Sequence, residues 1–152
     1  MDLSAITATV LLSSVLAALV REDLRSLRLP DRLTLPLVAA GVLLSAVGMT
    51  GTPIASSVLG GTVAYGVFWA VGHVHFARAG REGLGLGDAK LFAAIGTWLG
   101  LAALPPALLI ASLGGLVHAL ARRRSGKPEI AFGPWLALAF IACWAGRLTG
   151  IL

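Results

Sequence analysis

The chain has 152 residues, of which 57% are hydrophobic and 12% charged, and its mean hydropathy is +0.89. This composition excludes an ordinary soluble domain and indicates an integral membrane protein with the lipid bilayer as its surroundings. The net charge of +5 is not accompanied by a basic surface interleaved with aromatic residues, so we expect no nucleic acid partner. The single cysteine, Cys143, excludes a disulfide framework or a cysteine zinc site within the chain.

Apolar runs predict six transmembrane helices, at residues 3–20, 33–49, 54–76, 88–104, 105–121 and 130–152. The fourth and fifth helices form one run that is too long for a single crossing of about 20 residues. We divide this run at Pro105-Pro106, because proline starts or kinks a helix. The first run has no basic region before it and no convincing cleavage site, so we interpret it as a retained span. The expected fold is an all-α integral membrane protein, with residues 1–152 as a single transmembrane domain.

The basic residues predict the orientation of these helices, because cytoplasmic loops collect lysine and arginine. Six spans place the first, third and fifth loops on one face, and the turns between them carry no charge. Five spans would export three consecutive arginines. We therefore expect both termini on the outer side and these three loops in the cytoplasm. The cations of the three loops are Arg21, Arg25, Arg28, Arg32, Arg78, Arg81, Lys90, Arg122, Arg123, Arg124 and Lys127.

Two acidic residues stand out, because Asp23 follows the first predicted span and Asp88 begins the fourth. Two complete crossings separate them, so we expect both at the same membrane depth. Two carboxylates brought together in a poorly solvated place cannot both ionise easily; one keeps a proton while the other acts as a base. An aspartyl protease needs such a pair. The alternatives are a solvated loop acid at Asp23, beside Arg21 and Arg25, and a simple helix N-cap at Asp88.

Three alternate glycines, Gly83, Gly85 and Gly87, precede Asp88. Glycines in this pattern favour an extended backbone that another chain can approach closely. We expect a substrate to lie alongside this stretch in an extended form, as in strand addition. Two histidines, His73 and His75, end the third span, but residues two apart on a helix point to different faces, so we expect no metal site.

Three motifs carry a resemblance to a known family. The stretch Asp23-Leu-Arg-Ser-Leu-Arg-Leu-Pro30-Asp31-Arg-Leu-Thr34-Leu-Pro36 resembles the first signature of the type IV prepilin peptidases. Gly85-Leu-Gly87-Asp88-Ala-Lys90-Leu resembles their GxGD motif, and Phe132-Gly133-Pro134 resembles their third motif. The resemblance implies a GxGD membrane aspartyl endopeptidase of the inner membrane. Such an enzyme removes short basic leaders from pilin-like precursors at the cytoplasmic face.

By position in these motifs, the resemblance implies that Asp23 and Asp88 are the catalytic pair. We expect Asp31 to support the site by capping the second helix. Further residues of the motifs are expected to support the site or allow the substrate to approach: Pro30, Gly85, Gly87, Lys90, Phe132, Gly133 and Pro134.

The chain also departs from the longest family members. They carry an N-terminal region with four cysteines and methylate the new pilin N-terminus, whereas this sequence lacks those cysteines and resembles the short, peptidase-only branch. We therefore expect no zinc, no other cofactor and no methyltransferase activity. Ala131 stands where many relatives have proline.

The alternative functions are a small proton-coupled transporter and an inactive membrane scaffold for pilus assembly. A transporter would need acids near the middle of the bilayer and an inverted repeat, and the sequence shows neither. The sequence leaves the identity of the pilin and the oligomeric state undefined.

Overall fold

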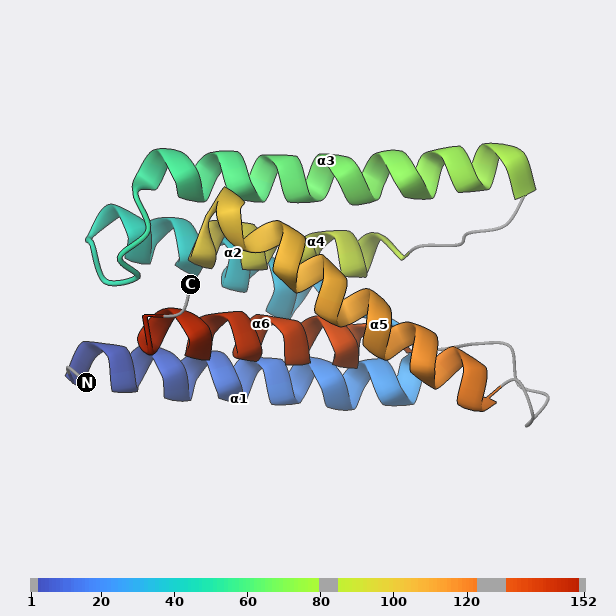
Figure 1. Ribbon diagram of the computed structural model, residues 1–152, viewed down its shortest axis with the longest axis horizontal. Helices are drawn as coiled ribbons and strands as arrows, with labels where there is room; N and C mark the ends of the chain where they lie inside the picture. Colours follow the sequence, from blue (N-terminus) through green and yellow to red (C-terminus); the bar gives the residue numbers. More distant parts are fainter. Residues whose placement is uncertain (1–2, 80–84, 123–130, 151–152) are drawn as a thin grey trace.

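The computed structural model describes residues 3–79, 85–122 and 131–150, and these ranges contain helices and turns but no strand. The prediction of an all-α fold is therefore confirmed. A short 3-10 helix, η1 (Leu101–Ala103), separates two of the six α-helices (Figure 1). The α-helices of this part of the chain are α1 (Leu3–Ser26), α2 (Asp31–Ala46), α3 (Ile54–Ala79), α4 (Leu86–Leu99), α5 (Leu104–Arg122) and α6 (Gly133–Leu148).

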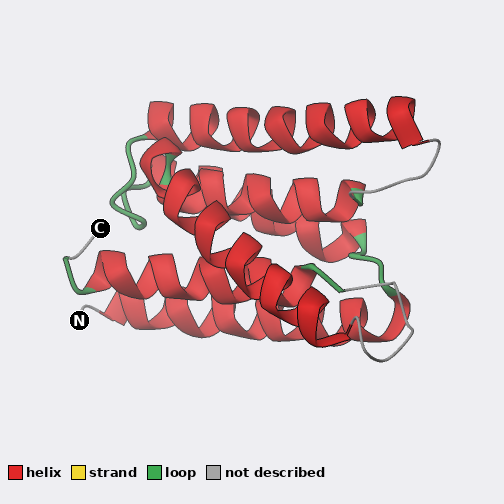
Figure 2. Cartoon of the chain, turned by 45° about the vertical axis from the view of Figure 1, so that its right-hand side comes forward, coloured by secondary structure: helices red, strands yellow, loops and turns green. Residues whose placement is uncertain are grey.

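The helices form an elongated bundle in which α1 begins and α6 ends at the same end (Figures 1 and 2). The helices α1, α3 and α5 end at the opposite end, so the three basic connections follow from that end, as their charge pattern predicts. The positions Arg81, Glu82, Gly83, Arg123, Arg124, Lys127 and Glu129 lie outside the described residues. The side of the membrane that this end faces remains a prediction.

The short helix α4 forms the centre of the bundle. Ala89 and all residues from 91 to 99 are buried, because α2, α3 and α6 pack around α4. A helix that is apolar on every side requires such a position. The closest approach is between α3 and α4, where a Cβ atom added at Gly60 would lie 2.6 Å from the carbonyl oxygen of Gly96. These glycines therefore serve packing between the chain's own helices.

The break between α4 and α5 lies at Gly100, because α4 ends at Leu99 and not at residue 104, where the predicted fourth span ends. Gly100 has a φ of +80°, which favours glycine. Pro105 and Pro106 lie in the first turn of α5, where the missing N–H of proline leaves no hydrogen bond unmade. The predicted division at Pro105-Pro106 was therefore wrong in position, because the chain turns at the glycine and the prolines only begin the next helix.

Polar side chains satisfy the carbonyl groups at the buried end of α4. Such groups have no partner within the helix and find no water in a bilayer core. The hydroxyl groups of three residues donate to them: Ser57 to Thr97 O (2.6 Å), Ser45 to Thr97 O (3.3 Å) and Thr52 to Trp98 O (2.7 Å). Arg147 completes the set from α6, since its Nη1 donates to Leu99 O (3.1 Å) and to Thr52 Oγ1 (2.7 Å). Buried polar groups thus hold α2, α3 and α6 to the end of α4.

Within the part of the chain that the structure describes, three helical segments are long and apolar enough to cross a membrane: Ala5–Ser26, Ile54–Ala77 and Leu101–Ala121. The segment Gly133–Leu148 is apolar but shorter. The helices α2 and α4 have 16 and 14 residues, below the roughly 17 residues that a perpendicular crossing needs. Many large apolar side chains on α1, α3 and α5 are exposed, as contact with lipid requires. The chain has the character of a membrane protein, and the number of six crossings remains a prediction.

Candidate active site

Asp23 lies three residues before the end of α1 and is only 4% exposed. Its Oδ2 atom accepts a hydrogen bond from the backbone N–H of Gly133, at 3.0 Å. Gly133 is the first residue of α6, and the N-terminal N–H groups of a helix favour a negative charge. The alternative of a solvated loop acid is therefore wrong, because α1 continues past residue 20 and carries Asp23 into the protein.

The third motif surrounds this carboxylate. A Cβ atom added at Gly133 would lie 2.7 Å from Asp23 Oδ2, so only glycine leaves room for the carboxylate at this distance. Phe132 precedes the helix as its N-cap residue, and Pro134 lies in the first turn, a position that proline favours. The motif thus starts α6 at the point where its first N–H group meets Asp23.

Asp88 is the third residue of α4 and is half-buried. Its backbone N–H donates to the carbonyl oxygen of Gly85, the N-cap residue, at 3.0 Å. The alternative that Asp88 itself is the N-cap is therefore wrong. Within the described residues, the carboxylate of Asp88 has no hydrogen-bond partner, and it is free to meet a water molecule or a substrate.

The two glycines described before Asp88 differ in conformation. Gly85 is exposed and extended, with φ −68° and ψ 138°. Gly87 is helical, and a Cβ atom added there would lie 2.7 Å from the Cβ atom of Leu29 and 3.2 Å from its carbonyl oxygen. The expected run of extended glycines is thus wrong at Gly87, because the helix already begins at Leu86. The missing side chain of Gly87 makes room for the chain's own connection between α1 and α2.

Asp23 and Asp88 line the same cavity, which has a volume of about 490 Å³ and is open to the outside. The sequence predicts that these two acids lie at the same depth, and in the structure both line this one cavity. Gly85 and Phe132 also line the cavity, whereas Pro30, Asp31, Lys90, Gly133 and Pro134 are not part of its lining.

One wall of the cavity comes from α5 and was not foreseen from the sequence. Its lining residues carry no charge and belong to no motif, so the sequence gives no direct signal for them. They are Ser112, Gly115, Leu116 and Ala119.

This wall is held by α6. A Cβ atom at Gly114 would overlap the indole ring of Trp135, and one at Gly115 would lie 3.1 Å from the ring of Phe132. The indole N–H of Trp135 also donates to Nδ1 of His118, at 3.2 Å. The pair of glycines in α5 is the one sequence feature that points to a close helix contact here.

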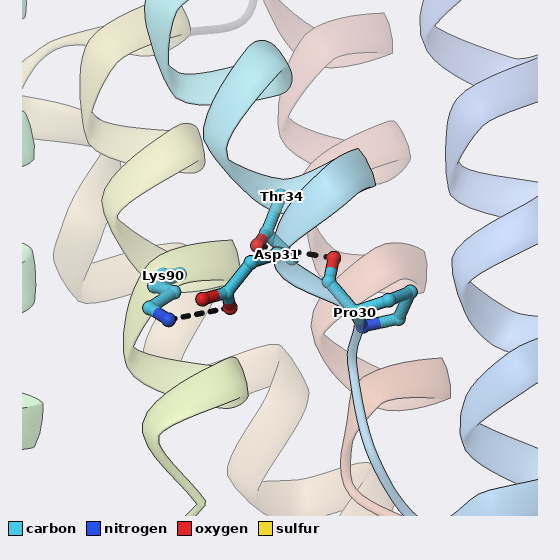
Figure 3. A network of polar contacts seen from close by, with 4 residues as sticks. All are labelled: Pro30, Asp31, Thr34 and Lys90. Carbon is cyan, nitrogen blue, oxygen red and sulfur yellow. Dashed lines mark hydrogen bonds and ion pairs between the residues drawn. The ribbon is translucent and has the colours of Figure 1, made fainter.

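Asp31 and Lys90 form an ion pair between the first residue of α2 and the second turn of α4 (Figure 3). The expected role of Asp31 as a cap is wrong. The N-cap residue of α2 is Pro30, and no side chain caps this helix. The carbonyl oxygen of Pro30 accepts hydrogen bonds from the backbone N–H and the Oγ1 of Thr34, at 3.2 and 3.4 Å.

No group of three or more His, Cys, Asp or Glu side chains among the described residues is placed to hold a metal ion. The site therefore consists of two carboxylates, one anchored by a backbone N–H group and one free, in an open cavity at one end of the bundle. The fold and the site together define a helical membrane protein with a paired aspartate site.

Comparison with known proteins identifies the family. Residues 10–120 match the model of the type IV leader peptidase family, and the chain belongs to this family. The match includes Asp23 and Asp88. It ends before the motif at 132–134, which contacts Asp23 in the structure.

The chain is similar to several curated proteins named prepilin leader peptidase/N-methyltransferase. It is 42% identical over 147 residues to the protein of Aeromonas salmonicida strain A449, and this alignment covers 94% of the chain and 49% of the relative. It is 45% identical over 120 residues to that of Escherichia coli strain K12, covering 76% of this chain and 52% of the relative. The chain thus spans about half the length of these relatives. No solved structure matches it significantly.

Proposed function

We propose that this protein is a membrane aspartyl endopeptidase that removes the short basic leader from type IV pilin-like precursors. Asp23 and Asp88 are the catalytic residues in this proposal. The observation that carries it is their convergence on one open cavity, although 65 positions separate them in the chain (88 − 23). Family membership and the names of the relatives support the substrate class.

The proposed reaction is hydrolysis of one peptide bond by a water molecule held between the two carboxyl groups. The ionised carboxylate takes a proton from this water, and the resulting hydroxide attacks the scissile carbonyl carbon. The protonated carboxyl group donates its proton to the carbonyl oxygen, so charge does not build up on the intermediate. Collapse of this intermediate breaks the C–N bond, and a proton passes from a carboxyl group to the leaving amine.

The surroundings of the two acids suit this division of work. The N–H group of Gly133 fixes the Asp23 carboxylate in one orientation, as a preorganised catalytic group requires. The Asp88 carboxylate carries no such hydrogen bond within the described part of the chain and can turn toward the substrate. The open cavity of about 490 Å³ offers room for an extended peptide.

The proposed location is the cytoplasmic (inner) membrane, with the cavity on the cytoplasmic side and both termini outside. Support comes from the charge pattern, since the basic connections follow the helix ends nearest the cavity. The whole chain, 1–152, acts as one peptidase domain in the bilayer. The expectation that it acts without zinc, another cofactor or a methyltransferase activity is part of this proposal.

The test is cleavage of a co-expressed prepilin by variants of equal abundance. Asp23→Asn and Asp88→Asn are expected to abolish cleavage, because each removes one of the two groups that move protons. Glu22→Gln is the matched control: Glu22 is the neighbour of Asp23 on α1 but does not line the cavity, so its loss leaves cleavage intact. If both asparagine variants still cut the precursor, the aspartyl mechanism is wrong. If the wild-type protein itself does not cut the precursor, a scaffold or transport function takes the place of the proposed one.

A further inference from the structure

We propose that the ion pair between Asp31 and Lys90 sets the separation of the two site aspartates, which makes both residues positioning residues. This inference rests on the proposed function of Asp23 and Asp88. The pair joins the beginning of α2 to α4, and Figure 3 shows the Lys90 side chain reaching from α4 toward Asp31. Lys90 is 20% exposed at its side chain and Asp31 59%, so the lysine lies largely inside the protein.

A short and hydrogen-bonded path leads from Asp31 to Asp23. Only residues 27–30 separate α1 from α2. Leu27, with a φ of 52°, closes the end of α1 by donating its backbone N–H to the carbonyl oxygen of Asp23, at 2.9 Å. Pro30 is held at the other side by the backbone and hydroxyl of Thr34. The position of Asp31 relative to Asp23 is therefore fixed by the backbone.

The path on the other side is shorter still, because Lys90 follows Asp88 by two residues within the same helix. The ion pair thus closes a ring that runs from Asp23 through the connection 27–30 to Asp31, then across to Lys90 and back to Asp88. Within this ring, the ion pair is the one polar side-chain link that the described residues provide between α2 and the first two turns of α4.

A second contact shows which side of α4 faces the connection. Gly87 packs against Leu29, and Gly87 and Lys90 lie three residues apart, on the same side of the helix. Asp88 follows Gly87 by about 100° around the axis, because a helix has about 3.6 residues per turn, and it faces the cavity. A rotation of α4 would therefore move Asp88 relative to Asp23, and the ion pair opposes this rotation where the helix has no side-chain cap.

A purely superficial ion pair is the competing interpretation, and it predicts no effect on turnover. Partly exposed ion pairs contribute up to about 1 kcal/mol, which corresponds to a factor of about 5 in a rate or equilibrium constant.

If the pair positions the site, we expect Lys90→Gln and Asp31→Asn each to lower kcat for prepilin cleavage by about 2- to 5-fold, with KM unchanged. Lys90→Arg keeps the charge and is expected to retain nearly full kcat. Arg32→Gln, next to Asp31 but outside the pair, is the control for loss of a nearby charge.

A double-mutant cycle separates a shared role from two independent ones. If the two residues act as a pair, the variant with both Lys90→Gln and Asp31→Asn loses no more kcat than either single variant. If the two losses multiply, or if Lys90→Gln lowers kcat no more than Lys90→Arg does, the proposal is overturned.

A further experiment reads the separation directly and does not depend on activity. In a Cys143→Ala background, the substitutions Asp23→Cys and Asp88→Cys introduce two thiols, and a short bifunctional thiol reagent cross-links them. Adding Lys90→Gln is expected to slow cross-linking by about 2- to 5-fold, and adding Arg32→Gln leaves it unchanged. Equal rates would refute the positioning role even if the aspartates are catalytic. A slower rate would support it even if cleavage fails for another reason, so the two failures are distinguishable.

Discussion

Gly133→Ala tests how closely the site depends on the contact between α6 and Asp23. The added Cβ atom would lie 2.7 Å from Asp23 Oδ2 and 3.0 Å from its Cγ. Both distances are shorter than van der Waals contact, so the carboxylate must move away from the backbone N–H group of residue 133. This N–H group donates a hydrogen bond to Asp23 Oδ2 at 3.0 Å in the wild-type protein. The substitution removes this hydrogen bond while it leaves both aspartates in the sequence.

The size of the effect follows from the strength of that bond. A hydrogen bond to a charged group contributes about 1.5 to 3 kcal/mol, and each 1.4 kcal/mol in the barrier changes a rate about tenfold. If the transition state needs Asp23 in its present place, kcat falls by about 10- to 100-fold. KM for the precursor changes little, since the backbone and the rest of the cavity remain.

The assay is cleavage of a purified prepilin in detergent, with the rate divided by the amount of folded enzyme. Gly66→Ala in α3 is the matched control, because an added Cβ atom meets nothing within 4 Å there. Alanine is more favourable than glycine in a helix by about 1 kcal/mol, so this control folds and cuts normally. A Gly133→Ala enzyme that turns over at the rate of the control would refute the anchoring of Asp23 by α6.

The remaining predictions concern glycines, stability and topology. Gly87→Ala is expected to lower both the abundance of the protein and kcat, because the added Cβ atom would lie 2.7 Å from the Cβ atom of Leu29. In Gly85→Ala the added Cβ atom makes only ordinary contacts, at 3.6 Å or more. This variant is expected to fold normally but to raise KM for the precursor. A wild-type KM for Gly85→Ala would exclude close substrate approach at this residue. Arg147→Gln is expected to lower the free energy of unfolding by about 2 kcal/mol, because charged hydrogen bonds to Thr52 Oγ1, Leu99 O and Gly51 O are lost. Thermal denaturation in detergent measures this loss of stability. The cleavage rate per folded enzyme stays unchanged, since Arg147 lies at the opposite end of the bundle from the aspartates. Reporter tags fused to either terminus are expected to show an outer location, and a cytoplasmic signal from one of them contradicts the six-span topology.

Features that depend on neighbouring residues could be predicted from the sequence. Apolar runs gave the helices, since a segment in a bilayer must satisfy its own backbone hydrogen bonds whatever surrounds it. Asp23 follows the first predicted span and Asp88 begins the fourth. This placement predicted that the two acids lie at the same face, because every second crossing returns the chain to that face. The motifs gave the family, which the comparisons confirm.

Features that depend on contacts between distant segments were decided by the tertiary structure alone. Gly133 donates to Asp23 across 110 positions, and Lys90 meets Asp31 across 59. No local pattern reports such a partner, which is why Asp31 was expected to cap a helix and was found in an ion pair. Gly87 shows the same limit: a glycine is equally suited to an extended strand or a close helix contact, and only the position of Leu29 selects between them.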